Sequence, residues 1–240
     1  MKILGFQKTT LLDYPEHIAS IVFTGGCNFA CPYCHNSELI RPSHKTPEIP
    51  EEEVLTHLKE KKGKIEGLVI TGGEPTLQED LYDFCKKVKE LGMLIKLDTN
   101  GTNFELVSRL VDEHLLDYIA LDAKMPAGLY KDVMPKKTTD TSIKKYTDSY
   151  VKCLEFLKKA PAHIDYEVRT TIVPDLLDTN SAEAMSRELS GIKKLYIQPF
   201  VNSDSVLVFG LREPTEHEMK YYRNVFRKHV KYVEIRGMDL

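Results

Sequence analysis

Apolar runs alternate with amphipathic, charged runs along most of the chain. Six apolar runs predict buried strands, at residues 18–23, 67–70, 94–98, 117–122, 164–173 and 194–200. Between them, apolar residues at helical spacing predict helices over about 51–62, 77–91, 103–114, 142–159 and 181–189. A helix over about 215–229 and a short strand, KYVEI, follow the sixth strand.

Strands that are separated by helices pair in parallel through right-handed crossovers. The unusual residues of this chain follow the predicted strands: a cysteine loop at 24–36, GGEP at 72–75, DTNG at 98–101, LDAK at 121–124, VRTTIVP at 168–174 and IQPF at 197–200. A barrel-like sheet gathers such strand ends at one rim, where active sites lie. Six strands are fewer than the eight of a closed barrel. We therefore expect an α/β fold, a partial (β/α)6 barrel that is open on one side.

Composition and charge narrow the class of protein. With 240 residues, 42% of them hydrophobic, the chain suits one domain over 1–240, with a core of about 17–200, an N-terminal head and a C-terminal helix and strand extension. A formal net charge of −3 gives no bias towards nucleic acid. No apolar run is long enough to span a membrane, and the first residues lack the apolar core of a signal peptide. We expect a cytoplasmic enzyme without a nucleic-acid or membrane partner.

The sequence TGGCNFACPYCHN, residues 24–36, places Cys27, Cys31 and Cys34 at Cys-x3-Cys-x2-Cys spacing. Three clustered thiols of five in total argue against a disulfide scaffold. They suit an iron–sulfur cluster with one iron free of protein ligands, or a structural zinc with His35 as the fourth ligand. Zinc ligands usually form two separated pairs, which favours the cluster. Cys85 and Cys153 lie on apolar faces of predicted helices, so we expect them to be core thiols and expect no second cluster.

The cysteine loop followed by GGEP resembles the radical S-adenosylmethionine (SAM) superfamily, and the resemblance covers roughly residues 1–200. It implies that the three cysteines hold a [4Fe–4S] cluster whose fourth iron binds SAM. In this family an electron from the cluster cleaves SAM, and the resulting 5′-deoxyadenosyl radical takes a hydrogen atom from the substrate. The cofactor carries the difficult step, so we assign no catalytic side chain beyond the cluster ligands.

The same resemblance implies a set of SAM contacts. Glu74 would accept a hydrogen bond from the SAM ammonium, and Gly72 and Gly73 would let the backbone approach closely. Tyr33 would shield the cluster and touch the adenine, although a purely structural aromatic residue is the alternative. The other expected cofactor contacts are His35, Asn36, Asn100, Lys124, Arg169 and Gln198. For Lys124 and Arg169, which would face the methionyl carboxylate or the ribose, a salt bridge at the rim is the alternative.

DTNG and LDAK resemble segments of the activators of glycyl-radical enzymes. In that group two aspartates help to hold a monovalent cation beside SAM, and they match Asp98 and Asp122. A helix cap or turn is the alternative for each. The head, GFQKTTLLDYPEHIASIVF, resembles the activating proteins of anaerobic ribonucleoside-triphosphate reductase, except that Glu16 stands where those heads usually have glycine. Pyruvate formate-lyase activators usually carry glycine at the position of Tyr14.

The resemblance thus implies an activase that generates a glycyl radical on a large partner, most closely anaerobic ribonucleotide reductase, with flavodoxin or ferredoxin as electron donor. Two enzyme alternatives stay open: a radical SAM enzyme acting on a small molecule, such as a deazapurine-type synthase, and a pyruvate formate-lyase activating enzyme. Outside that class, an electron carrier would not need GGEP, and a zinc-binding interaction module would be colourless.

Overall fold

The computed structural model describes residues 1–238, and its strands form one eight-stranded sheet ordered as in the chain. The strands are β1 (Ile3–Thr10), β2 (Ala19–Thr24), β3 (Gly67–Gly72), β4 (Leu94–Thr99), β5 (Tyr118–Asp122), β6 (Asp165–Ile172), β7 (Lys194–Pro199) and β8 (Tyr232–Ile235). β1 runs antiparallel to β2, and all the other neighbouring strands are parallel. In the described part of the chain no pairing joins β8 to β1, so the sheet is open.

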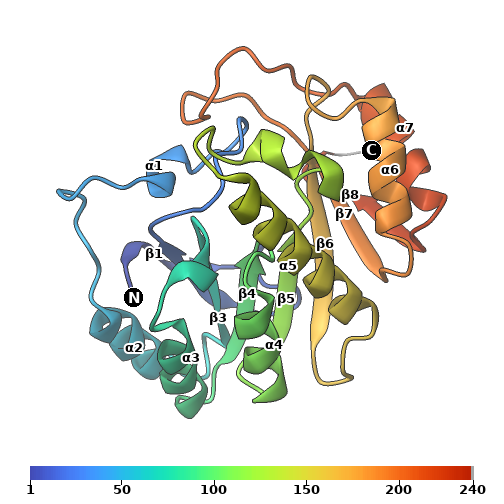
Figure 1. The fold of residues 1–240 in the computed structure, drawn as a ribbon. Coiled ribbons are helices and arrows are strands. Elements are labelled where there is room, and N and C mark those ends of the chain that lie inside the picture. The colour runs from blue at the N-terminus through green and yellow to red at the C-terminus, as the bar shows by residue number, and fades with distance from the viewer. Residues whose placement is uncertain (239–240) are drawn as a thin grey trace.

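Helices connect the strands and cover one face of the sheet (Figure 1). They are α1 (Ser37–Ile40), α2 (Glu51–Glu60), α3 (Leu81–Glu90), α4 (Phe104–Asp112), α5 (Asp140–Lys158), α6 (Thr179–Glu188) and α7 (Glu216–Arg227), with 3-10 turns η1 (Pro75–Leu77) and η2 (Ala127–Val133). The apolar stripe of α3 explains this packing, since Leu81, Phe84, Cys85 and Val88 are all buried. Among residues 1–238, none of the helices is both long enough and apolar enough to cross a membrane.

The predicted α/β fold with an open, mainly parallel sheet is confirmed. The six predicted strands correspond to β2 to β7, and KYVEI forms β8. β8 extends the sheet at one edge as the predicted short strand, whereas β1, at the other edge, was not predicted. β1 escaped prediction because its sequence, ILGFQKTT, does not alternate between apolar and polar residues; only Ile3 and Thr10 are buried.

The two faces of the sheet differ in chemistry. Alternate residues of a strand point to opposite faces, so the main apolar core lies under the helices. The other face carries a small apolar cluster of Tyr14, Ala19, Ile21, Val69 and Tyr118. Tyr14 comes from the β1–β2 connection and packs edge-on against Tyr118, with ring centroids 5.9 Å apart. Above this cluster, towards the carboxyl ends of the strands, the face becomes polar and charged.

Candidate functional site

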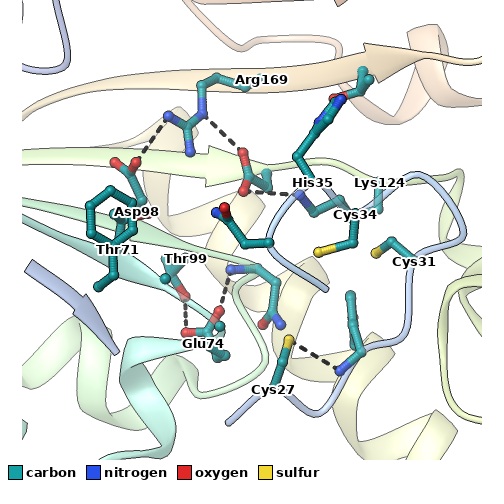
Figure 2. Close-up of a pocket in the computed structure, with 18 of the residues that line it drawn as sticks. Cys27, Cys31, Cys34, His35, Thr71, Glu74, Asp98, Thr99, Lys124 and Arg169 are labelled. Carbon is teal, nitrogen blue, oxygen red and sulfur yellow. Dashed lines mark hydrogen bonds and ion pairs between the residues drawn. The ribbon is translucent and has the colours of Figure 1, made fainter. Parts of the chain in front are cut away.

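A cavity of about 320 Å³ lies at the carboxyl ends of the parallel strands, a size suited to a small-molecule ligand. Every residue that the sequence predicted as a cluster ligand or cofactor contact lines it: Cys27, Cys31, Tyr33, Cys34, His35, Asn36, Gly72, Gly73, Glu74, Asp98, Asn100, Asp122, Lys124, Arg169 and Gln198. Figure 2 shows the sulfur atoms of the three cysteines on one side and Asp98 with Arg169 on the other. The structure thus brings these residues together, while their roles remain predictions.

The cysteine loop connects β2 to α1 and is held by backbone hydrogen bonds from several segments. The amide of Gly26 donates to the carbonyl of Leu39 at 2.7 Å. The amide of Ala30 donates to the carbonyl of Val133, at the end of η2, at 2.8 Å. The carbonyl of Pro32 accepts from the amide of Val208 at 2.9 Å. Three separate segments therefore hold the backbone of the loop.

The three thiols fit a cluster better than a zinc ion. Burial raises the pKa of Cys27 to about 12 and that of Cys31 to about 11, so both thiols need a bound cation to ionise. His35, the candidate fourth zinc ligand, is engaged elsewhere, since its Nε2 lies 2.6 Å from the carbonyl oxygen of Val201. In residues 1–238 no three His, Cys, Asp or Glu side chains meet as a single ion requires. A [4Fe–4S] cluster instead takes one thiolate on each of three irons.

Glu74 is 1% exposed, and its carboxylate accepts four hydrogen bonds from the protein. Oε1 accepts from the amide and hydroxyl of Thr76 at 3.1 and 2.6 Å and from the hydroxyl of Thr99 at 2.7 Å. Oε2 accepts from the amide of Asn100 at 2.8 Å. Burial raises the pKa of Glu74, and these hydrogen bonds oppose the rise. Oε2 retains the capacity for one more donor, so the predicted contact with the SAM ammonium stays open.

Gly72 and Gly73 allow the end of β3 to approach the cysteine loop. Gly72 has a φ of +124°, and a Cβ there would lie 2.2 Å from the amide nitrogen of Thr24. A Cβ on Gly73 would lie 2.1 Å from the carbonyl oxygen of Gly26. The family resemblance predicts that these glycines let the backbone approach SAM closely. The structure adds a reason within the protein, because the neighbouring backbone leaves no space for a side chain.

A network of side-chain hydrogen bonds joins the cysteine loop to the loop after β4. The Nδ2 of Asn100 donates to the Oδ1 of Asn28 at 2.9 Å, and the Nδ2 of Asn28 donates to the hydroxyl of Thr102 at 2.7 Å. The Oδ1 of Asn100 accepts from the amide and the hydroxyl of Thr102. Asn100 therefore positions the loop that carries Cys27. Asn28 and Thr102 were not predicted, because nothing in their spacing indicates that they meet.

Five charged side chains form a continuous network at the wall of the cavity, and all of them except Lys96 line it. Arg169 links the two aspartates, with its Nε donating to Asp122 at 2.9 Å and its Nη1 donating to Asp98 at 3.1 Å (Figure 2). The Nζ of Lys124 donates to the second oxygen of Asp122 at 3.0 Å. The Nζ of Lys96 donates to the second oxygen of Asp98. All four carboxylate oxygens thus have a cationic partner, and three positive charges face two negative charges.

This pairing removes the basis for the predicted monovalent cation beside Asp98 and Asp122. Burial by itself would raise the pKa of Asp122, but Arg169 and Lys124 outweigh it and lower the pKa to about 2. The pKa of Asp98 is lowered by Arg169 and Lys96, again against the effect of burial. Both aspartates are therefore ionised and already neutralised by the protein. The structure gives no support to a bound cation here.

Several residues in or behind the cavity wall were not predicted from the sequence. Lys96 is the most informative: it does not line the cavity itself, but it is 2% exposed, lies two positions before Asp98 on the same face of β4, and pairs with that aspartate from behind. That alternation was the signal that could have revealed it. Asp13 reaches the cavity from the β1–β2 connection, which is part of the expected N-terminal head. Cys85 and Cys153 are buried and do not line the cavity, which confirms them as core thiols.

Three comparisons place the chain among known proteins. The profile of the radical SAM superfamily matches residues 21–178. A Methanocaldococcus jannaschii protein with the provisional name glycyl-radical enzyme activating enzyme is 30% identical over 240 residues, covering 99% of this chain and 96% of the relative. The pyruvate formate-lyase-activating enzyme of Clostridium pasteurianum is 28% identical over 211 residues, covering 83% of this chain and 82% of that enzyme.

The fold is also that of solved structures. In the crystal structure of Streptococcus suis SuiB, the match has a TM-score of 0.61 at 12% identity and covers 90% of this chain but 48% of that chain. The chain therefore spans about half the length of SuiB, and this likeness concerns the fold alone. With the profile match and the whole-length relative, the class is established: the chain is a radical SAM enzyme and belongs to the radical SAM superfamily.

Proposed function

We propose that this enzyme activates a glycyl-radical enzyme by removing a hydrogen atom from the Cα of a glycine in a partner protein. The observation that carries the proposal is the similarity over 99% of the chain to a relative provisionally named as such an activating enzyme. The similarity over 83% of the chain to a pyruvate formate-lyase-activating enzyme supports the same class of reaction. A glycine Cα radical is stabilised by its two flanking peptide groups, so a short loop that carries the glycine can serve as substrate.

Cys27, Cys31 and Cys34 hold the [4Fe–4S] cluster in this proposal, and the bound cluster supplies the electron that cleaves SAM. The protein's own contribution is to hold and orient the cofactor and to exclude water. Tyr33, 5% exposed, covers the cluster side of the cavity, and its hydroxyl lies 3.4 Å from the carbonyl oxygen of Lys124. The surplus positive charge of the network suits the methionyl carboxylate of SAM.

The finer proposal is that the partner is an anaerobic ribonucleoside-triphosphate reductase and that flavodoxin or ferredoxin supplies the electron. The head sequence supports this choice of partner. Tyr14, at the position where pyruvate formate-lyase activators usually carry glycine, is 3% exposed and packs on the floor of the sheet against Tyr118. A glycine there would remove the aromatic ring from the apolar cluster around Tyr118, so the two kinds of head pack differently against this face of the sheet.

The test is anaerobic EPR after mixing the reduced, cluster-loaded protein with SAM and a candidate partner. We expect a doublet, from the single remaining Cα hydrogen, with the reductase, and none when the partner's glycine is replaced by alanine. Pyruvate formate-lyase offered in parallel should give no signal. A doublet with pyruvate formate-lyase alone would reassign the partner. Turnover of SAM with a purine-like small molecule, and no doublet with either partner, would contradict activase function.

Cysteine variants supply the matched controls for this experiment. Cys27→Ala should abolish iron binding, SAM cleavage and the glycyl signal together. Cys85→Ala removes a thiol from the core under α3 and should keep the iron content, at a cost of about 1–2 kcal/mol in stability. Iron analysis and absorbance spectra of both variants check this. Full SAM cleavage by Cys27→Ala would be incompatible with the assigned ligands, as would iron loss from Cys85→Ala.

A further inference from the structure

Lys96 is a lysine almost without solvent contact, in the middle of a strand. It is 2% exposed and lies on the charged face of β4, beside Tyr118, whose ring centroid is 5.9 Å from its Nζ. A buried ammonium is costly unless it is paired and hydrogen-bonded. Its partner is the Oδ1 of Asp98, and the Oδ2 of Asp98 accepts from Arg169. The position thus places a fixed positive charge against an aspartate that lines the cavity.

Two aspartates at neighbouring strand ends would attract a cation from solution if the protein left them unpaired. Here Asp98 and Asp122 are joined through Arg169, and each has a lysine on its remaining oxygen. Lys124 is two residues after Asp122 and partly exposed, so it could turn towards a ligand. Lys96 has no such freedom because β3, β4 and β5 surround it in the sheet. Of the two lysines, Lys96 is therefore the one that stays paired with its aspartate.

We propose that Lys96 is a positioning residue whose tethered ammonium replaces an exchangeable monovalent cation beside Asp98. It keeps Asp98 ionised and in place to hold Arg169, so the cavity wall keeps its geometry in any salt. A tethered group has a local concentration that the medium does not change. Affinity for SAM is therefore independent of potassium and sodium. This inference rests on the proposed binding of SAM in this cavity.

The experiment measures the SAM dissociation constant of cluster-loaded protein by equilibrium dialysis. Potassium, sodium and tetramethylammonium chloride are compared at equal ionic strength, the last cation being too large for a carboxylate niche. The wild-type value should be the same in all three salts. Lys96→Met should bind SAM about tenfold more weakly in tetramethylammonium and recover in potassium. Lys96→Arg, which keeps the charge, should show no dependence on the salt.

Two further measurements separate this role from a purely structural one. The thermal midpoint of the cluster-free protein should rise with potassium in Lys96→Met but not in wild type. This measurement needs no SAM. Lys89→Met is the matched control, because it removes a lysine whose Nζ lies 2.8 Å from Asp117, at the opposite end of the strands. It should lower stability without creating any dependence on the cation.

Three results would overturn the proposal: wild-type affinity that depends on potassium, Lys96→Met that binds SAM normally in tetramethylammonium, or weak binding by Lys96→Met that no cation restores. If Lys96→Met does not fold, the SAM dissociation constants of wild type and Lys96→Arg in the three salts still test the proposal. If wild-type protein binds no SAM in any salt, the proposed function fails. The melting of the cluster-free protein then still tests the tethered cation.

Discussion

At the scale of single side chains, Glu74 links two segments that line the cavity. Its four hydrogen bonds join η1, through Thr76, to the end of β4, through Thr99, and to the loop that follows, through Asn100. Such a carboxylate is an acceptor at every position, and all its partners are donors. The residue therefore has a structural function in the protein alone, in addition to the contact with SAM that its motif predicts.

Glu74→Gln should affect stability and cofactor binding together. The amide presents an NH2 group to donors that need an acceptor, which should cost about 1–3 kcal/mol of folding free energy. Loss of the charge opposite the SAM ammonium should weaken SAM binding by about 10- to 150-fold. Urea denaturation and equilibrium dialysis measure the two effects. Glu79→Gln, on the exposed surface five residues further, should change neither. A Glu74→Gln protein of normal stability and normal SAM affinity would refute both roles.

The sequence could predict which residue types gather in the site but not all their contacts. The ligands and motif residues are recognisable because each follows a predicted strand. Lys96 could have been found from its place two residues before Asp98 on one strand, whereas Asn28 was missed because its partners depend on how loops from different strands meet. Spacing along the chain does not contain that information. For Glu74 and Gly73, spacing found the residues, and only the structure shows the second set of contacts that constrains them.

The connection between β1 and β2 carries backbone strain at the scale of an element. Glu16 has a φ of +66°, a left-handed conformation that costs an ordinary residue about 1–2 kcal/mol and glycine almost nothing. The resemblance of the head predicts a glycine at this position. A left-handed turn favours glycine, and this chain makes the turn with a glutamate instead.

Glu16→Gly should stabilise the protein by about 0.5–1 kcal/mol, since relief of the strain exceeds the added flexibility of the unfolded chain. Chemical denaturation measures the gain. Glu16→Ala removes the same side chain but keeps the Cβ, so it should give no gain. SAM cleavage should be unchanged in both variants, and only partner activation should respond to Glu16→Gly. Equal stability of the glycine and alanine variants would show that φ is not the source of strain.

Elements with strong periodicity were predictable, and so was β8 at one edge of the sheet, but β1 at the other edge was not. The helix α3 has four buried apolar residues on one face, and the sequence pattern identified that same face. β1 gains its stability from pairing with β2, at registers interrupted by two irregularities, rather than from its own apolar pattern. An edge strand of that kind becomes visible only when its partner is known.

On the scale of the whole molecule, the fold divides its chemistry between two faces of one sheet. The helices bury an apolar core on one face, whereas the other face places the charges of β4, β5 and β6 side by side. Asp122 and Arg169 are direct neighbours in the β5–β6 register, so a long-range ion pair follows from the strand order. Parallel order and a short connection to each strand end are enough to bring Cys27, Glu74 and Arg169 to one cavity.

This charge network makes the free energy of unfolding depend on pH in the acid range. The pKa of Asp122 falls from 3.8 to about 2 in the folded state, so between these values the unfolded chain binds more protons. Stability from Asp122 is thus fully present above about pH 4 and is lost as the pH falls towards 2. The contribution is about 2 kcal/mol at most, because the side chain is 23% exposed.

Asp122→Asn should therefore be about 2 kcal/mol less stable than wild type at neutral pH, and this difference should shrink as the pH falls below about 4. Urea denaturation of both proteins across the acid range measures it, and taking the difference cancels the titration of all other groups. Asp148→Asn, which removes an exposed i,i+4 partner of Lys144, is the control and should show a small difference at every pH. A difference between wild type and Asp122→Asn that stays constant down to pH 2 would mean that Asp122 is not ionised against Arg169 and Lys124 in the folded protein.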